Sequence, residues 1–268
     1  SSPPRRSSDL TVARVLWTGG WDSTFRLLQL AMPRDVLVEP HYIIDTARRS
    51  TPIEIRTMSV IREDIRKCFP GADERILPTR FFSIHEIAPD HEITGRYQRL
   101  KALSHLGTQY DWLARYAKQQ GLDDLELTIE AETAPHLFIK RHLTKRQDPT
   151  IGEYYSLDPD LDRADDLRLF DCFRFPLLDW TKIGMLEHAK QHGWLEILMA
   201  TWFCQRPRKG KPCGVCNPCR NAIKEGMGLR FSRSTLIRNK LNEIMHYPKR
   251  ARRKAKADER LRARGLIE

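Results

Sequence analysis

The sequence lacks several features that would assign it to common classes of protein. No apolar run approaches the roughly 20 residues that a membrane-spanning helix needs, so we expect no membrane partner. There is no Gly-x-Ser-x-Gly motif, so the sequence gives no support for a serine hydrolase of the type that uses this turn. The segment Ser1-Ser2-Pro3-Pro4-Arg5-Arg6-Ser7-Ser8 lacks the apolar core of a signal peptide, and residues 1–11 are expected to form a disordered leader.

The order of the apolar segments indicates the fold class. Strand-like and helix-like segments alternate along the chain, and this order is typical of a parallel sheet wrapped by helices. The strand-like segments are residues 12–17, 36–44, 125–129 and 169–175, and the helical ones are residues 23–31, 53–68, 99–120 and 182–192. The sequence therefore predicts an α/β, Rossmann-like domain over residues 12–200, with helices on both faces of a parallel sheet.

A glycine pair, Gly19-Gly20, separates the first apolar strand from the first amphipathic helix. Glycines let the backbone approach an anion closely, and the helix start adds unpaired N–H groups and its positive dipole end. The turn is not a Walker loop, because Asp22 stands where that loop has a lysine. A carboxylate beside phosphates needs a divalent cation between them, so Asp22 predicts Mg²⁺ together with a triphosphate or pyrophosphate. An ordinary strand-to-helix turn is the alternative.

Four of the six cysteines lie within sixteen positions: Cys204, Cys213, Cys216 and Cys219. Cys213, Cys216 and Cys219 form two overlapping C-x-x-C motifs, and Cys204 can supply the fourth thiolate of a tetrahedral Zn²⁺ site. Four sulfur ligands leave no position for substrate on the ion. The cysteines therefore predict a structural zinc module over residues 201–230, with an iron–sulfur cluster as the alternative. Disulfides fit poorly, because the isolated Cys68 and Cys172 and the phosphate-type loop indicate the reducing cytosol.

The loop Thr18-Gly19-Gly20-Trp21-Asp22-Ser23-Thr24 resembles the S-G-G-x-D-S loop of the N-type ATP pyrophosphatases, with Thr18 in place of Ser. Those enzymes cut ATP to AMP and pyrophosphate while they adenylate an acceptor. Over most of residues 12–228 the chain more specifically resembles the 7-cyano-7-deazaguanine synthases of the queuosine pathway. The matching segments outside the loop are His41-Tyr42, Thr94-Gly95-Arg96, residues 175–182, and Thr201-Trp202-Phe203-Cys204 with the cysteine spacing that follows.

The resemblance implies a ligase that uses ATP, Mg²⁺ and a structural Zn²⁺. Enzymes of this family adenylate the carboxylate of 7-carboxy-7-deazaguanine, capture ammonia to form the amide, and dehydrate the amide to the nitrile. By the resemblance, the residues from Thr18 to Thr24 would hold the β- and γ-phosphates, with Trp21 as a lid or as a core residue. Lys182 would add a cation to the phosphates, and Arg96 would contact ATP or the acid. The implied catalytic set is Asp22, Ser23, Lys182 and Arg96.

The chain departs from this family after residues 125–129, where the family's deazaguanine-reading motif is not visible. Glu130 and Glu132 stand there instead. Either carboxylate can accept two hydrogen bonds from a guanine-like edge, or the pair can belong to a solvated loop. The sequence thus leaves open the identity of the small-molecule acid, the amine and the dehydration step.

The net charge of +11 is concentrated near the end of the chain. Residues 249–264 hold nine Lys or Arg against Asp258 and Glu259, within a segment, residues 231–268, expected to be a basic helical extension. Such a helix can bind nucleic acid or a protein partner, or it can be a solvated face or a subunit-packing helix. The resemblance alone suggests a homodimer. Two other functions stay open: a tRNA-modifying enzyme of the thiolase or lysidine-synthase type, and a catalytically silent ATP-binding partner protein.

Overall fold

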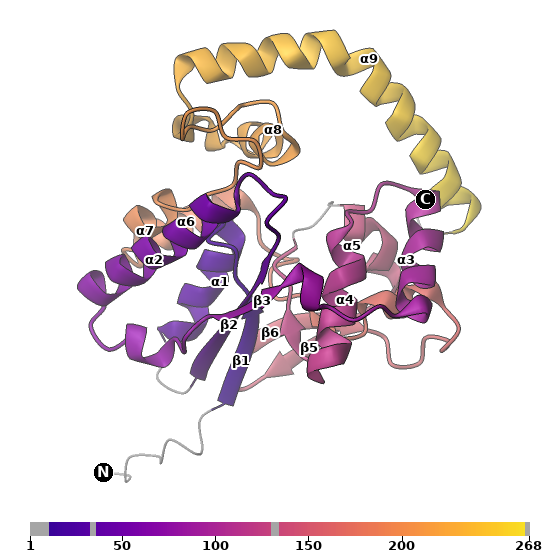
Figure 1. Ribbon diagram of the computed structural model, residues 1–268, viewed down its shortest axis with the longest axis horizontal. Helices are drawn as coiled ribbons and strands as arrows, with labels where there is room; N and C mark the ends of the chain where they lie inside the picture. The colour runs from indigo at the N-terminus through magenta and orange to yellow at the C-terminus, as the bar shows by residue number, and fades with distance from the viewer. Residues whose placement is uncertain (1–10, 33–35, 130–133, 266–268) are drawn as a thin grey trace.

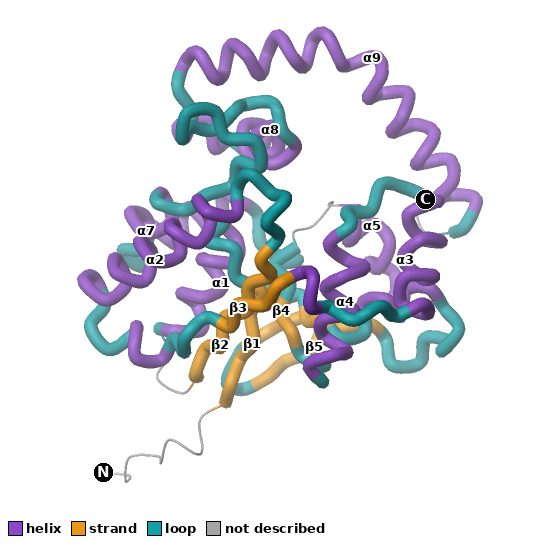
Figure 2. Tube along the Cα trace, in the orientation of Figure 1, coloured by secondary structure: helices purple, strands orange, loops and turns teal. Residues whose placement is uncertain are grey.

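A five-stranded parallel sheet lies at the centre of the molecule (Figures 1 and 2). The computed structural model describes residues 11–32, 36–129 and 134–265. The strand order is β3-β2-β1-β4-β7. The strands are β1 (Thr11–Leu16), β2 (Val36–Ile44), β3 (Arg80–Ser83), β4 (Leu125–Glu126) and β7 (Phe173–Arg174). This arrangement confirms the predicted α/β, Rossmann-like class.

The two longest neighbouring strands of the sheet set the position of the glycine loop. β1 pairs with β2 from Thr11 against Val36 to Leu16 against His41, so both strands lead to the same edge of the sheet. β2 is buried over most of its length and rich in β-branched residues, as a central strand covered on both faces must be. The loop after β1 therefore lies at the carboxyl edge, where α/β sheets bind ligands.

Helices cover both faces of the sheet and define two apolar cores. One core contains side chains from α1 (Trp21–Ala31), α2 (Thr51–Cys68), α6 (Lys182–Gln191) and α7 (Leu195–Met199). The other contains side chains from α3 (His91–Leu103), α4 (Gln109–Gln120) and α5 (Ala134–Ile139). Alternate residues of β2 divide between the two cores: Val38 and Tyr42 face the first, and Ile43 faces the second.

Some local predictions differ from the structure, and one hairpin was not predicted. The helix expected over residues 99–120 is two helices, α3 and α4, and Thr94-Gly95-Arg96 lies inside α3. The backbone is extended at Ser104, directly after α3 ends at Leu103, so the two helices are separate. The strand expected over residues 169–175 is a 3₁₀ turn, Asp166–Phe170, followed by the short β7. A hairpin of β5 (Leu143–Asp148) and β6 (Gly152–Leu157) was not predicted.

The last part of the chain forms a cysteine-rich module and one long helix. The module contains α8 (Asn217–Lys224) and the 3₁₀ turn Met227–Arg230. Helix α9 (Arg233–Ala263) then arches away from the module and returns to the body beside α3 (Figure 1). It contains Pro248, which removes one backbone donor from the helix. In the described part of the chain, no helix combines the length and apolarity that crossing a membrane demands.

Candidate functional site

The glycine loop joins β1 to the start of α1 at the carboxyl edge of the sheet. Gly19 has a φ of +66°, and a Cβ atom there would lie 3.2 Å from Met58 Cγ and 3.3 Å from the Glu54 carbonyl oxygen. Both the backbone conformation and the packing therefore favour glycine. Gly20 is the N-cap of α1, and no side chain of the described residues caps that helix end. The N–H groups of the first turn are thus available to an anion, as the sequence predicted.

The polar side chains of the loop have different surroundings. Ser23 Oγ lies 3.4 Å from both the Thr18 nitrogen and the Gly20 carbonyl oxygen, so it bridges the two ends of the loop. Thr24 is fully buried and accepts a hydrogen bond of 3.0 Å from Trp17 Nε1. The phosphate contact predicted for the Thr24 hydroxyl does not fit this buried position. Trp21 is 4% exposed and belongs to the core, so its side chain is a core residue and not a lid.

Asp22 and Lys182 meet at the start of α1. Lys182 is the first residue of α6. Thr181 caps the N-terminus of this helix by accepting a hydrogen bond of 3.0 Å from the Gly184 nitrogen. The Lys182 ammonium donates to an Asp22 carboxylate oxygen, and the Lys182 side chain is only 10% exposed. The structure thus brings together the acid and the cation that the sequence assigned to one site.

A second cation, Arg230, lies close to Asp22 and was missed in the sequence. Its guanidinium donates to the Thr201 carbonyl and to Thr201 Oγ1, and lies 4.6 Å from the ring centroid of Phe203. Burial lowers the pKa of Arg230 to about 10, and the Asp22 carboxylate opposes this shift. No motif surrounds Arg230 in the sequence, so only the fold shows that it belongs to the site.

Glu225 adds a further titratable group to this region. It ends α8, and burial raises the pKa of its carboxyl group. The Lys182 ammonium opposes this rise, and the Asp22 carboxylate adds to it. Two cations and two carboxylates from four separate segments therefore lie near the glycine loop: Lys182, Arg230, Asp22 and Glu225.

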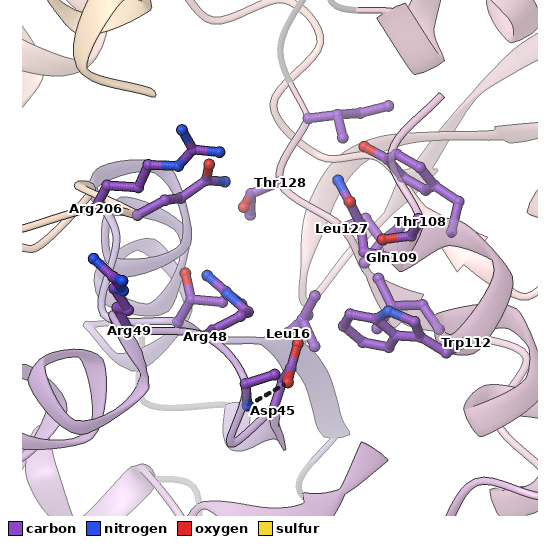
Figure 3. A pocket seen from close by; sticks show the side chains of 16 residues that line it. Leu16, Asp45, Arg48, Arg49, Thr108, Gln109, Trp112, Leu127, Thr128 and Arg206 are labelled. Carbon is purple, nitrogen blue, oxygen red and sulfur yellow. Dashed lines mark hydrogen bonds between the residues drawn. The ribbon is translucent and has the colours of Figure 1, made fainter. Parts of the chain in front are cut away.

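A cavity of about 810 Å³ opens beside the loop, and Thr18 contributes to its wall. One side carries Arg48, Arg49 and Arg206, and the opposite side carries Gln109 and Trp112 (Figure 3). Residues at or just beyond the ends of three strands, β1, β2 and β4, line it as well: Leu16, Asp45, Leu127, Thr128 and Ile129. The cavity can hold an organic molecule beside a phosphate group, with arginines for its negative charge and an aromatic ring for stacking.

Arg96 does not join this cluster. Arg96 lies on α3, on the other face of the sheet from α1. Its guanidinium donates to the Asp165 and Arg163 carbonyls and to Glu92, at distances of 2.8 Å. These bonds hold the segment before β7 in place, and the contact of Arg96 with ATP or the acid stays a prediction. Glu130 and Glu132 lie outside the described residues.

The four cysteines of the module come together in a buried cluster. Their sulfur atoms all lie within 4.8 Å of one another, with Sγ–Sγ distances of 3.9 Å for Cys213–Cys219 and 4.0 Å for Cys204–Cys216. A tetrahedral ion with bonds of about 2.3 Å places its sulfur ligands about 3.8 Å apart, so the cluster can hold a metal ion. Backbone N–H groups of Cys213, Val215 and Cys216 point to the sulfurs of Cys204 and Cys213 and help to stabilise thiolates.

The fold and the site together define an α/β, Rossmann-like protein with a glycine loop before an uncapped helix start, an adjacent cavity and a four-cysteine centre. No family model matches the chain, and no curated protein matches it. One matching solved structure is a 4-thiouridine synthetase–RNA complex with bound ATP. The identity is 14% and the TM-score 0.37, over 82% of this chain and 50% of that one, so this chain spans about half of its length. A likeness this distant carries no argument about function, which has to come from the residues of this chain.

Proposed function

We propose that the protein is an ATP-dependent enzyme of the ATP pyrophosphatase type, which activates a carboxylate and releases pyrophosphate and AMP. The observation that carries this proposal is the contact between Asp22 and Lys182 at an uncapped helix start, beside a loop that opens into a cavity. A phosphate-binding loop with a carboxylate and a cation suits a nucleotide that is bound with a divalent ion.

The proposed chemistry separates into two steps. In the first, a carboxylate oxygen of the substrate attacks the α-phosphorus of ATP, and the bond from that phosphorus to the bridging oxygen breaks. Negative charge then collects on the departing pyrophosphate, where the Lys182 ammonium and the N–H groups of α1 stabilise it. In the second step an amine, ammonia in the simplest case, attacks the acyl carbon and AMP leaves. Asp22 would hold Mg²⁺, which neutralises the phosphate oxygens.

The acid that we propose is of the 7-deazaguanine type. The cavity supports a planar anionic substrate, because Trp112 offers a stacking surface and Arg49 and Arg206 face it from the other side. Among the described residues, Arg49 and Arg206 have no side-chain hydrogen bond or ion pair that would occupy them. Amide formation needs one activation of the acid, and a nitrile needs a second activation followed by dehydration.

We assign the four-cysteine centre to Zn²⁺ with a structural role. Four buried sulfur ligands fill a tetrahedron, which leaves no position for water or substrate on the ion. The ion would hold together a segment that contains little regular structure apart from α8.

The test is to incubate the protein with Mg·ATP, 7-carboxy-7-deazaguanine and ammonium, and to follow AMP, pyrophosphate and deazaguanine products by mass spectrometry. AMP with the amide or the nitrile is the expected result. The variant Asp22→Ala should lose pyrophosphate release by a factor of at least about 100 and keep its fold, since this side chain is 24% exposed. Full turnover in Asp22→Ala would contradict the assignment of the phosphate site.

A second candidate is an ATP-dependent enzyme that acts on RNA. The observation that favours it is α9, whose middle part carries exposed arginines and lysines and passes from the cysteine module to α3. Binding of RNA to this helix separates the two candidates, because a free deazaguanine acid needs no such surface.

A further inference from the structure

The cysteine module and the glycine loop touch through the segment that leads to the first cysteine. The Trp202 nitrogen donates a hydrogen bond of 2.9 Å to the Gly19 carbonyl oxygen. A Cβ atom on Gly20 would lie 3.6 Å from the Trp202 carbonyl oxygen, so the two backbones run close together. Trp202 Nε1 in turn donates to the Cys204 carbonyl oxygen at 2.8 Å. A continuous set of contacts thus leads from the phosphate loop to the cysteine cluster.

Arg230 forms a second connection between the same two sites. It lies in the turn after α8, the helix that has Cys216 as its N-cap and contains Cys219. Its guanidinium donates to Thr201 and stacks over Phe203, and it also lies 5.4 Å from the ring centroid of Trp21, the first residue of α1. These contacts hold the guanidinium beside Trp21, where the glycine loop continues into α1.

Arg230 also lacks a direct counter-ion. In the described part of the chain it forms no ion pair with a carboxylate within 4.0 Å, although it is partly buried between two aromatic rings. Carbonyl and hydroxyl oxygens satisfy some of its N–H groups but do not neutralise its charge. Asp22 acts on Arg230 only from beyond that distance and is itself paired with Lys182, so the charge of Arg230 is incompletely balanced. An anion that binds beside Arg230 lowers this cost.

We propose that Arg230 is a phosphate-binding residue supplied by the cysteine module, so that a metal ion at the four cysteines and a nucleotide at the glycine loop bind cooperatively. This inference rests on the proposed function, because it takes the anion at the loop to be the pyrophosphate part of ATP. Lys182 reaches the same place from α6, which contains none of the cysteines. Arg230 therefore couples the two sites, and Lys182 does not.

The coupling has a reciprocal consequence. If metal tightens nucleotide binding by some factor, the nucleotide must tighten metal binding by the same factor. Metal retention thus reports on nucleotide binding without any turnover. The useful probe is the Mg²⁺ complex of α,β-methylene-ATP, whose α–β linkage resists cleavage.

The experiment measures two quantities on zinc-loaded protein: the affinity for the Mg·α,β-methylene-ATP complex, and the rate at which a chromophoric chelator removes zinc with and without it. In the wild type the nucleotide should slow zinc release several-fold. Arg230→Met should weaken nucleotide binding by about tenfold or more, since it removes charge-assisted hydrogen bonds. It should also abolish the protection of zinc. Arg230→Lys, which keeps the charge but loses the planar fork, should fall between the two.

Arg233→Met is the matched control. Arg233 is exposed at the start of α9, and it has no hydrogen bond or ion pair within the described residues. This control should behave as the wild type in both measurements. Zinc content and far-ultraviolet circular dichroism verify that each variant is folded before it is compared.

The outcomes separate the inference from the function. A wild type that binds the nucleotide but shows no protection of zinc overturns the coupling and leaves the proposed function in place. Unchanged nucleotide affinity in Arg230→Met and Arg230→Lys overturns the phosphate contact. A wild type that does not bind the nucleotide at all overturns the proposed function, and the inference with it.

Discussion

At the scale of single residues, the least expected environment is that of His41. It lies on β2, is 1% exposed, and has hydrogen-bonding partners at both ring nitrogens: Tyr116 Oη at 2.7 Å and Glu39 Oε2 at 3.0 Å. Burial lowers the pKa of His41 below its ordinary value of 6.5, and this effect outweighs the opposite effect of the Glu39 carboxylate. Arg80 and Arg14 also pair with Glu39, so they compete with the His41 imidazole for the negative charge of the Glu39 carboxylate. The neutral form of His41 is therefore the form that the fold stabilises.

This environment predicts a loss of stability in mild acid. Because the folded-state pKa of His41 is lower than the unfolded one, the unfolded chain binds more protons in the window just below pH 6.5. Stability is therefore highest above that window and falls as the pH decreases through it. Glu39 also has a lowered pKa, but its window lies below pH 4.5 and does not interfere. Urea unfolding at pH 8 and pH 5.5 should show a smaller loss for His41→Gln than for the wild type.

The control for this prediction is His246→Gln, which changes an exposed histidine of α9. It should show the same loss between the two pH values as the wild type. If His41→Gln loses as much stability as the wild type over this range, then His41 does not bind fewer protons in the folded state.

At the scale of secondary-structure elements, the sequence predicted some elements correctly and missed others. The limits of β2 were predicted as observed, since apolar and mostly β-branched residues stand at both of its ends. The cysteine cluster was predicted from spacing, because two C-x-x-C steps and a nearby fourth cysteine are typical of a metal site. The hairpin β5–β6 was missed, because its strands are polar and partly exposed. Arg230 and Trp112 reach the site only through the fold, and no neighbouring residues mark them.

The contact between α1 and β4 depends on a buried ion pair. Arg26 donates two hydrogen bonds of 2.7 Å to Glu126 and one of 2.9 Å to the Ile151 carbonyl oxygen at the β5–β6 turn. The two side chains are 6% and 1% exposed. Arg26→Met should lower the free energy of unfolding by about 3–5 kcal/mol, because it leaves a buried carboxylate without a partner. Urea unfolding at neutral pH measures this loss.

A double variant and a surface variant complete this test. Adding Glu126→Gln to Arg26→Met should recover part of the loss, because the buried negative charge is removed as well. Arg66→Met breaks exposed ion pairs with Glu63 and Asp73 and should cost no more than about 1 kcal/mol. A loss below about 1 kcal/mol in Arg26→Met would show that this pair does not hold α1 to β4.

At the scale of the whole molecule, α9 joins two parts that lie on either side of the cavity. Its first turns are held to the cysteine module by Arg238 and Asn239, which donate to the Cys213 and Gly214 carbonyls at 3.0 and 2.8 Å. Near its other end Leu261 is 1% exposed in the core that contains α3 and α4, and Arg260 donates to the Ala102 carbonyl at 3.0 Å. Figure 1 shows that the helix between these two contacts arches clear of the body. The middle of α9 is therefore a charged surface fixed at both ends.

If the second candidate function is correct, the middle of α9 is the surface that binds RNA. Arg252, Arg253 and Lys254 are exposed, and the described residues offer them no acidic partner. Each phosphate that such cations neutralise contributes about −0.7 to −0.9 to the slope of log affinity against log salt concentration. Replacing these three residues with glutamine should weaken tRNA binding at low salt and reduce that slope by about 2. Fluorescence anisotropy over a range of salt concentrations measures both changes.

The matched control removes the same charge from another surface, by changing Arg56, Lys67 and Lys190 to glutamine. These residues lie on α2 and α6, away from the arch. An equal loss of binding in both triple variants would mean that tRNA responds to net charge alone and not to α9. The second candidate is excluded if the wild type binds no tRNA and releases AMP with the free deazaguanine acid. In that case the substrate is a small molecule, and α9 does not bind RNA.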